Sequence, residues 1–239
     1  MTGSGSRDAA LGELFSAIAA RDAATALRLL AETPGLARQA AVGGATRQEA
    51  KAYFFDAIMH YAYGGDTALH MAAAAYATDI ARDLLARGAD VRAKNRRGAE
   101  PLHYAADGHP DSPGWNPDAQ AAVIRLLIEA SADANAADKS GVAPLHRAAR
   151  TRCAAAVDAL LTGGADVRLK NEKGSTALHL AVQDTGRGGS GSDAAREQQM
   201  QVIRLLIAHG ARPMDTNAAG KSVRECVRAD WVAGLLDER

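Results

Sequence analysis

One eight-residue phrase recurs four times along this chain of 239 residues, and no other feature restricts its fold as strongly. The copies read DTALHMAA at 66–73, AEPLHYAA at 99–106, VAPLHRAA at 142–149 and STALHLAV at 175–182. Each copy is followed by a second phrase with paired leucines and a turn: LLARGADVRAKN, LLIEASADANAAD, LLTGGADVRLKN and LLIAHGARPMDTN. This alternation is the signature of a repeat architecture.

The spacing of the copies defines a base unit. Units 65–97 and 141–173 are 33 residues long, whereas 98–140 and 174–219 have 43 and 46 residues and therefore carry insertions. Within a unit, apolar residues recur at helical spacing in two short segments, which predicts a pair of helices. One pair cannot bury both of its faces, but a row of pairs can.

The pattern resembles the ankyrin repeat, whose first helix opens at T-P-L-H-x-A-A, whose second helix ends in a leucine pair, and whose G-A-D-V-N turn leads onward. The resemblance covers about Asp8 to Leu236. It implies an all-α ankyrin-repeat solenoid of about six stacked helix-turn-helix units in one domain, 8–239. We expect a disordered N-terminus at 1–7, an N-terminal cap at 8–38, an inserted helix at 39–64, repeats at 65–97, 98–140, 141–173 and 174–219, and a C-terminal cap at 220–239.

Three insertions interrupt the repeats. The first lies between units one and two, where Thr46 and Glu49 form a capping-box pattern and apolar residues at helical spacing predict a helix over 47–63. The second, at 107–120, contains three prolines and Trp115 and should be semi-rigid. The third, around 184–199, is rich in glycine and serine and should be mobile until Ser192 or Asp193 caps the next helix.

Aromatic residues make up only 4% of the chain, yet most of them lie between Tyr53 and Trp115. One explanation is a docking face on the inserted helix, made by Tyr53, Phe54, Ile58 and Tyr61. The other is a site, because several residues of this region fall outside that face: Phe55, Asp56, His60, Tyr63, Tyr76 and Tyr104.

The four repeat histidines are His70, His103, His146 and His179. The ankyrin resemblance implies a structural role for them, bonding between neighbouring units. Glu100 replaces the usual threonine before His103 and places a carboxylate near that imidazole, while Ala143 removes the threonine hydroxyl from the next unit.

Asp56 and His60 form an i,i+4 pair on the predicted helix, which suits either a general base with its orienting carboxylate or a solvated pair. The sequence leaves these alternatives open.

Other chemistries find little support in the sequence. The glycine-rich segment 186–191 lacks the strand and the GK[ST] of a phosphate loop, and the Cys and His spacings predict neither a metal site nor any other cofactor. Cys153 and Cys226 are expected to be reduced thiols.

Lys and Arg balance Asp and Glu at 28 each, which argues against nucleic acid and anionic membranes as partners. The chain has no apolar run of the ~18–20 residues that span a bilayer, and its start does not look like a signal peptide, so we expect a cytoplasmic protein.

The leading hypothesis is a non-catalytic module that holds a protein partner or ligand in a concave groove, narrowed by the inserted helix and the 107–120 loop. The resemblance places such contacts on turn tips and first helices, where the basic side chains of Arg96, Arg97, Lys139, Arg150 and Lys173 favour an acidic partner unless they are simply solvated. The candidate binding residues are Phe55, His60, Tyr63, Tyr76, Arg96, Arg97, Tyr104, Asp107, His109, Trp115, Lys139, Arg150 and Lys173.

The alternative is a small-molecule carrier or a cofactor-independent lyase or cyclase, in which Asp56, His60, Glu100 and Tyr104 perform acid–base chemistry such as dehydration or cyclisation. A closed cavity between 50–63 and units two and three would favour this alternative. An open groove would favour a protein partner.

Overall fold

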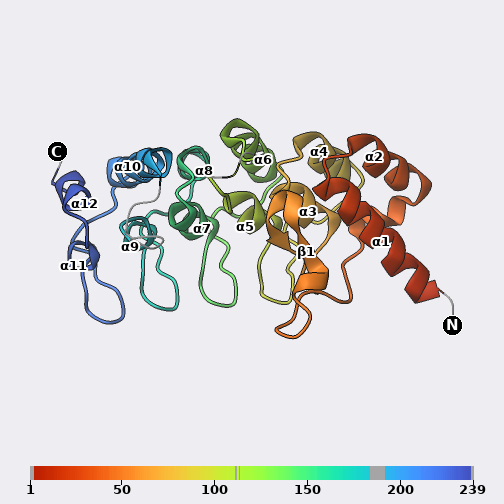
Figure 1. Ribbon diagram of the computed structural model, residues 1–239, viewed down its shortest axis with the longest axis horizontal. Coiled ribbons are helices and arrows are strands. Elements are labelled where there is room, and N and C mark those ends of the chain that lie inside the picture. Colours follow the sequence, from red (N-terminus) through yellow and green to blue (C-terminus); the bar gives the residue numbers. More distant parts are fainter. Residues whose placement is uncertain (1–2, 111, 113, 184–191, 238–239) are drawn as a thin grey trace. The chain divides into compact units, whose positions relative to one another are not determined.

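The computed structural model describes residues 3–110, 112, 114–183 and 192–237, and within them the chain forms consecutive helix pairs (Figure 1). The pairs are α1 (Gly3–Ala19) with α2 (Ala23–Glu32), α3 (Ala68–Ala74) with α4 (Thr78–Ala86), α5 (Pro101–Ala106) with α6 (Pro117–Glu129), α7 (Pro144–Thr151) with α8 (Ala154–Thr162), α9 (Ala177–Ala181) with α10 (Asp193–Ala208), and α11 (Val223–Cys226) with α12 (Asp230–Leu235). The predicted all-α repeat architecture is confirmed. In the described part of the chain, no helix is long and apolar enough to cross a membrane.

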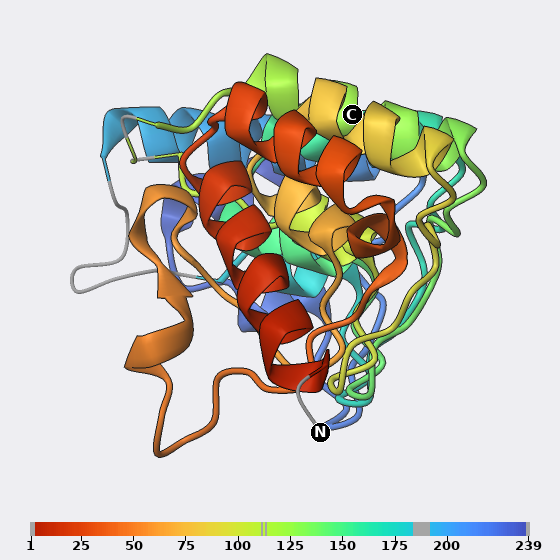
Figure 2. The same ribbon diagram turned by 90° about the vertical axis from the view of Figure 1, so that its right-hand side faces the viewer.

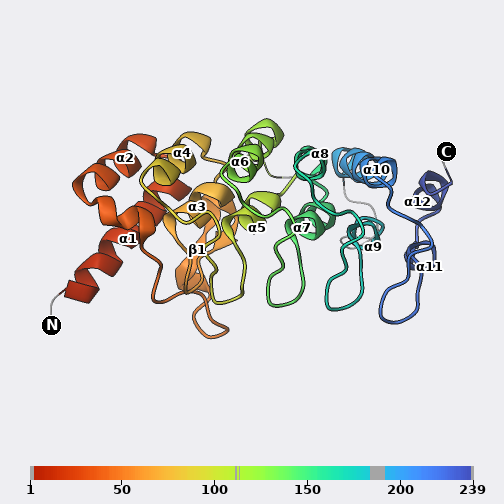
Figure 3. The same cartoon turned by 180° about the vertical axis from the view of Figure 1, so that it is seen from behind.

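The chain divides into two compact units. The N-terminal unit comprises Met1–Ala105 with Ala122–Asp133, and the C-terminal unit comprises Ala106–Ala121 with Ala134–Arg239. Within the C-terminal unit, the first helices α7 and α9 pack on each other, and α8 packs on α10 in a second layer (Figures 1 and 3). Within the N-terminal unit, α1 packs on α3 and α2 on α4 in the same way.

The repeat histidines connect successive repeats. The N–H of Thr67 donates to Nδ1 of His70 (3.1 Å), so Nε2 carries the proton and faces the carbonyl of Ala99 at 3.1 Å. His146 lies in the same way between the N–H of Ala143 (3.1 Å) and the carbonyl of Ser175 (3.0 Å). The structural role predicted for these two histidines is confirmed.

His179 repeats the arrangement, because its Nδ1 accepts from the N–H of Thr176 and its Nε2 faces the carbonyl of Lys221 at 3.4 Å. Burial lowers the pKa of both His146 and His179, which favours the neutral imidazole that this bonding pattern needs.

The N-terminal helix starts earlier than the sequence suggested. We expected disorder at 1–7, whereas α1 already begins at Gly3. Small polar residues are weak helix formers, but once a helix has nucleated, each further residue adds a hydrogen bond at little cost. Residues 1–2 lie outside the described part of the chain.

The helix predicted over 47–63 is wrong. The insertion follows a 3₁₀ turn, η1 (Pro34–Arg38), and is built from η2 (Lys51–Tyr53), β1 (Phe54–Phe55), η3 (Asp56–Ile58) and β2 (His60–Tyr61). The two strands pair antiparallel, with Phe54 opposite Tyr61 and Phe55 opposite His60. Thr46 does accept a hydrogen bond from the N–H of Glu49 (3.1 Å), but no α-helix follows.

The hairpin forms because two influences outweigh the helical pattern. The aromatic run from Tyr53 to Phe55 favours extended backbone, and the rings of Phe54 and Tyr61 gain a cross-strand contact, with centroids 4.6 Å apart. Met59 adopts the left-handed conformation (φ 50°, ψ 39°), which turns the chain back on itself. We refer to residues 39–64 below as the hairpin insertion.

The predicted buried face is wrong as well, because Tyr53, Phe54, Ile58 and Tyr61 are only half-buried. Successive side chains of a strand point to opposite faces, so a set chosen at helical spacing does not share one side of a hairpin.

The 107–120 loop is anchored to the C-terminal unit. Nε1–H of Trp115 donates to Oε1 of Gln120 (2.9 Å), and Nε2 of Gln120 donates to the carbonyl of Asp107 (3.1 Å). A Cβ added at Gly108 would lie 2.4 Å from Sγ of Cys153, so the chain there packs too closely for a side chain. These contacts hold the two ends of the loop in place; residues 111 and 113 lie outside the described part of the chain, and the semi-rigidity of the loop stays a prediction.

The third insertion falls largely on residues 184–191, which the description leaves out, and the prediction of mobility there stays a prediction. Ser192 accepts a hydrogen bond from the N–H of Ala195 (3.1 Å) and caps α10, as its sequence predicted.

Candidate functional site: turn tips, hairpin insertion and pocket

A side-chain oxygen closes each turn tip. Oδ1 of Asn95 accepts from the N–H groups of Arg97 (2.9 Å) and Ala99 (3.1 Å). Oδ1 of Asp138 accepts in the same way from Ser140 (2.8 Å) and Val142 (3.1 Å). Because each oxygen bonds two residues of its own turn, it fixes the backbone of that turn.

The next two tips repeat this geometry. Oδ1 of Asn171 accepts from Lys173 (2.9 Å) and Ser175 (3.1 Å). Oδ1 of Asn217 accepts from Ala219 (2.9 Å) and Lys221 (3.1 Å). In all four turns, the N–H of the Asn or Asp also donates to the carbonyl four residues later, at 3.0 Å.

Backbone hydrogen bonds join neighbouring tips within each unit. In the C-terminal unit, the N–H of Glu172 donates to Ser140 (3.1 Å) and that of Ala218 to Lys173 (3.0 Å). In the N-terminal unit, the N–H of Arg96 donates to Gly64 (2.7 Å). The tips therefore hold exposed side chains on fixed backbone: Arg96, Arg97, Lys139, Ser140, Glu172, Lys173, Ala218 and Ala219.

Tyr63 of the hairpin insertion orients both arginines of the first tip. The guanidinium carbons of Arg96 and Arg97 lie 5.4 and 5.1 Å from the centroid of the Tyr63 ring. Arg97 also donates to the Tyr63 hydroxyl (3.1 Å), and Arg96 donates to the carbonyl of Ala45. These contacts restrict two side chains that a free loop would leave mobile.

Arg147 is the centre of a charged network in the C-terminal unit. Its guanidinium donates to Asp107 (2.8 Å) and Asp138 (3.1 Å), and Arg150 lies 3.7 Å from the other oxygen of Asp107. Burial would raise the pKa of Asp138, but the two tip N–H groups and Arg147 hold that pKa below its usual value. Asp138 therefore stays ionised and ties its tip to α7.

We predicted that Tyr104 lies in an accessible groove. This prediction is wrong, because Tyr104 is only 1% exposed. Its hydroxyl donates to Asp66 at 2.7 Å from Oδ2, and Asp66 is itself fully buried. The ring of His60 stacks on the ring of Tyr104, with centroids 4.1 Å apart. Tyr104 holds the interior of the N-terminal unit together.

The other candidate acid–base groups are dispersed. Glu100 is fully buried, and its carboxylate oxygens make no hydrogen bond among the described residues; they lie 3.6 Å from Nζ of Lys94 and 4.0 Å from Nε of Arg92. Nδ1 of His103 accepts from the backbone N–H of Glu100 (3.1 Å), and the carboxylate that the sequence placed near this imidazole makes no hydrogen bond to it among the described residues. Asp56 is exposed in η3 and His60 lies in β2, so the predicted helical i,i+4 pair does not form.

The remaining predicted binding residues fall in both units. In the N-terminal unit, Phe55 is half-buried, as is Tyr76, which has a positive φ of 55° at the end of α3. In the C-terminal unit, Trp115 is half-buried, whereas His109, Lys139, Arg150 and Lys173 are exposed.

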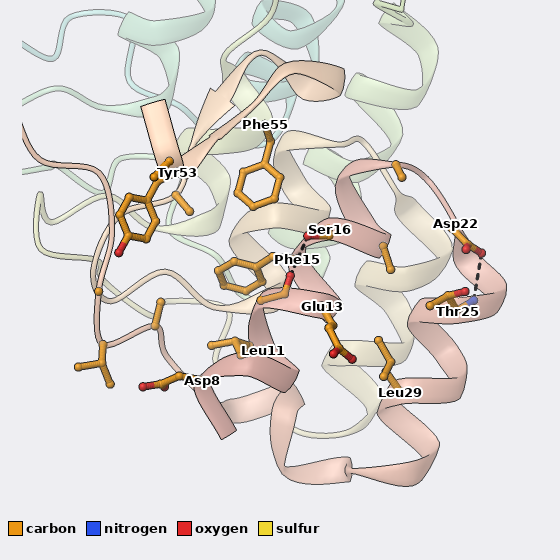
Figure 4. Close-up of a pocket in the computed structure, with 18 of the residues that line it drawn as sticks. Asp8, Leu11, Glu13, Phe15, Ser16, Asp22, Thr25, Leu29, Tyr53 and Phe55 are labelled. Carbon is orange, nitrogen blue, oxygen red and sulfur yellow. Dashed lines mark hydrogen bonds between the residues drawn. The ribbon is translucent and has the colours of Figure 1, made fainter. Parts of the chain in front are cut away.

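The structure adds a pocket of about 930 Å³ that the sequence did not indicate. It lies between α1, α2 and the hairpin insertion (Figure 4), whereas we had placed a cavity between residues 50–63 and units two and three. Leu11 and Phe15 are one helical turn apart on α1, a spacing that indicates an apolar helix face but not the pocket in front of it.

Residues 117–189 match the family described as 'Ankyrin repeats (3 copies)', and 64–96 and 173–218 match the family described as 'Ankyrin repeat'. The chain belongs to the ankyrin-repeat proteins. Ankyrin repeats are generally protein-binding modules, and they bind along extended surfaces.

The ankyrin-repeat chain is similar to the Ankyrin repeat and SOCS box protein 6 of Homo sapiens and to that of Pongo abelii. Each is 32% identical over 205 residues, which cover 82% of this chain and 45% of the relative. The chain thus spans less than half the length of these curated relatives.

Proposed function

We propose that this ankyrin-repeat protein binds a protein partner through its turn tips and that basic tip side chains select an acidic surface. The observation that carries the proposal is the closure of each tip by an Asn or Asp side chain. A tip fixed before binding loses little conformational entropy when a partner docks, so its exposed side chains contribute more of their contact energy to affinity.

Charge supports the second part of the proposal. Lys139 and Lys173 are exposed at two tips of the C-terminal unit, and Arg150 is exposed at the end of α7. Such groups accelerate the association of an oppositely charged partner and disfavour basic competitors. The 107–120 loop adds a second surface in the same unit. It is held by the hydrogen bonds that Gln120 makes with Trp115 and Asp107, and by the bond from Arg147 to Asp107.

The test is capture of partners from a lysate of the cells that produce the protein, followed by quantitative mass spectrometry. The double variant Lys139→Glu/Lys173→Glu should capture the specific partners at least tenfold less than the wild type. A matched double variant, Arg82→Glu/Arg125→Glu, makes the same charge change on exposed positions of the second helices α4 and α6 and should capture them normally. Equal loss in both variants, or none in either, would overturn the proposal.

A further inference from the structure

The pocket of the N-terminal unit has an apolar floor. Leu11 and Phe15 of α1 and Leu29 of α2 are buried there, with Phe15 4% exposed. The hairpin insertion supplies the opposite wall, where Tyr53 and Phe55 are half-buried, and Figure 4 shows Phe15 and Phe55 among the side chains that line the pocket. Aromatic walls of this kind hold bulky apolar side chains.

The rim of the pocket is acidic. Asp8, Glu13 and Asp22 line it and are exposed. The cation in the lining, Arg28, already donates from Nη1 to both carboxylate oxygens of Glu32, at 2.8 and 2.9 Å. A hydrogen bond from Thr25 lowers the pKa of Asp22, which keeps that carboxylate charged.

The hairpin insertion makes this pocket, because without it α1 and α2 would face solvent on that side. Figure 2 shows the insertion beside α1, and the pocket lining passes from α1 to the stretch 41–43 and to the first strand of the hairpin. Val42 in this stretch is 79% exposed, a large apolar side chain at the rim. An apolar floor with an exposed apolar edge and a charged rim is the arrangement of a protein-binding hot spot.

We infer that this pocket binds a short basic peptide segment of a partner protein, with a bulky apolar side chain against Phe15 and Phe55 and lysine or arginine side chains on the acidic rim. Its volume of about 930 Å³ lies at the upper end of the range for ligand sites and accommodates several side chains. The charge preference is opposite to that of the basic tips, so the pocket is a second site with its own class of ligand.

The experiment uses the full chain and a peptide of sequence Lys-Leu-Trp-Lys-Leu-Lys, labelled with fluorescein and followed by fluorescence anisotropy. Two control peptides carry glutamate in place of every lysine, or serine in place of leucine and tryptophan. The basic apolar peptide should bind with a Kd below 1 mM, and each control at least tenfold more weakly. No binding of the first peptide, or equal binding of either control, overturns the inference.

Variants locate the site. Phe55→Ala removes one wall and Glu13→Lys reverses one rim charge, so each should weaken peptide binding about tenfold. Glu197→Lys makes the same charge change on an exposed glutamate of α10 and should change the Kd less than twofold. If Phe55→Ala disturbs the hairpin, as circular dichroism would reveal, Glu13→Lys decides the question, because its side chain is exposed.

Glycine amides give an independent readout by two-dimensional NMR. Gly12 and Gly43 line the pocket and should shift on titration with the basic peptide, whereas Gly141 and Gly174 at the tips should not. Shifts confined to the tip glycines would place the peptide elsewhere and overturn the inference. The tip variant Lys139→Glu/Lys173→Glu should bind the peptide like the wild type.

Discussion

In each of the two units, the residue that follows one repeat histidine ties a first helix to a turn tip. In the N-terminal unit it is Tyr104, whose hydroxyl accepts from Nδ2 of Asn95 (3.0 Å) and donates to Asp66. In the C-terminal unit it is Arg147, which donates to the tip residue Asp138 and to Asp107. The equivalent positions in the other repeats hold the apolar residues Met71 and Leu180.

Both residues connect a first helix to a turn tip, but the buried charge at the centre is a carboxylate in one unit and a guanidinium in the other. Around Tyr104, one buried carboxylate is surrounded by neutral donors: the tyrosine hydroxyl, the Asn95 amide and the N–H of Tyr63 (2.6 Å). Around Arg147, one guanidinium lies between two carboxylates. Losing a neutral donor leaves a partly satisfied carboxylate, whereas losing the guanidinium leaves two largely buried carboxylates with weaker charge compensation, because only the exposed Arg150 then lies near Asp107.

Arg147→Leu should therefore have the largest effect. Arg147, Asp107 and Asp138 have side chains only 11%, 17% and 8% exposed, so the substitution should lower the free energy of unfolding by about 3–5 kcal/mol. Urea unfolding of the purified protein measures this change.

The triple variant Asp107→Asn/Asp138→Asn/Arg147→Leu is the control. It removes both carboxylates together with the guanidinium, while Asn at position 138 can still close the tip as Asn171 does. It should recover most of the lost stability. A triple variant as unstable as Arg147→Leu would show that the arginine acts by packing rather than by charge.

Tyr104→Phe should have an intermediate effect. It deletes the hydroxyl that donates to Asp66 and leaves the ring stacked on His60, so we expect a loss of about 1–3 kcal/mol in urea unfolding. The sequence had placed Tyr104 among the candidate binding residues, whereas its burial gives the hydroxyl a part in stability. A loss as large as that of Arg147→Leu would remove the difference between the two solutions.

The smallest effect concerns the position before the repeat proline, where Glu100 and Ala143 replace the threonine of the other repeats. Burial raises the pKa of Glu100 above its ordinary value near 4.5, despite Arg92 and Lys94. The folded state therefore favours the protonated form of Glu100. The stability that this preference contributes is fully present below the pKa of Glu100 in the unfolded chain, and it is lost as the pH rises through the higher pKa of Glu100 in the folded chain. Glu100→Gln should be more stable than the wild type by about 1 kcal/mol at pH 7.

The pH dependence distinguishes this explanation from a packing effect. The stability difference between Glu100→Gln and the wild type should shrink as the pH falls from 7 toward 4, because the wild-type carboxylate becomes protonated. Thermal unfolding at several pH values measures it. A difference independent of pH would show that the charge of Glu100 is not the cause.

The repeat positions could be predicted because their chemistry is local. The 33-residue period, the leucine pairs and the bonding of His70, His146 and His179 depend on contacts that recur from one copy of the unit to another. The cap at Ser192 was equally readable, since it bonds a residue three positions away.

The hairpin insertion and the candidate site could not be predicted in this way. The spacing of apolar residues around Tyr53 and Phe54 fits a helix, but the same aromatic residues also favour two short strands. The chain forms the strands, with Met59 in the left-handed conformation at the turn between them. Tyr104 looked accessible because its partner Asp66 is 38 residues earlier in the chain. The pocket needed the insertion and α1 to come together, which no local pattern encodes.

The closed tips affect which positions of the chain can vary during evolution. Since the Asn or Asp and the backbone form each turn, the exposed residues just after it are free of folding duties at positions such as 139, 140, 172 and 173. Mutation can sample side chains there without risking the fold, provided that the closing residue is kept. The same positions are suited to randomised libraries, in which new specificities are selected on an unaltered scaffold.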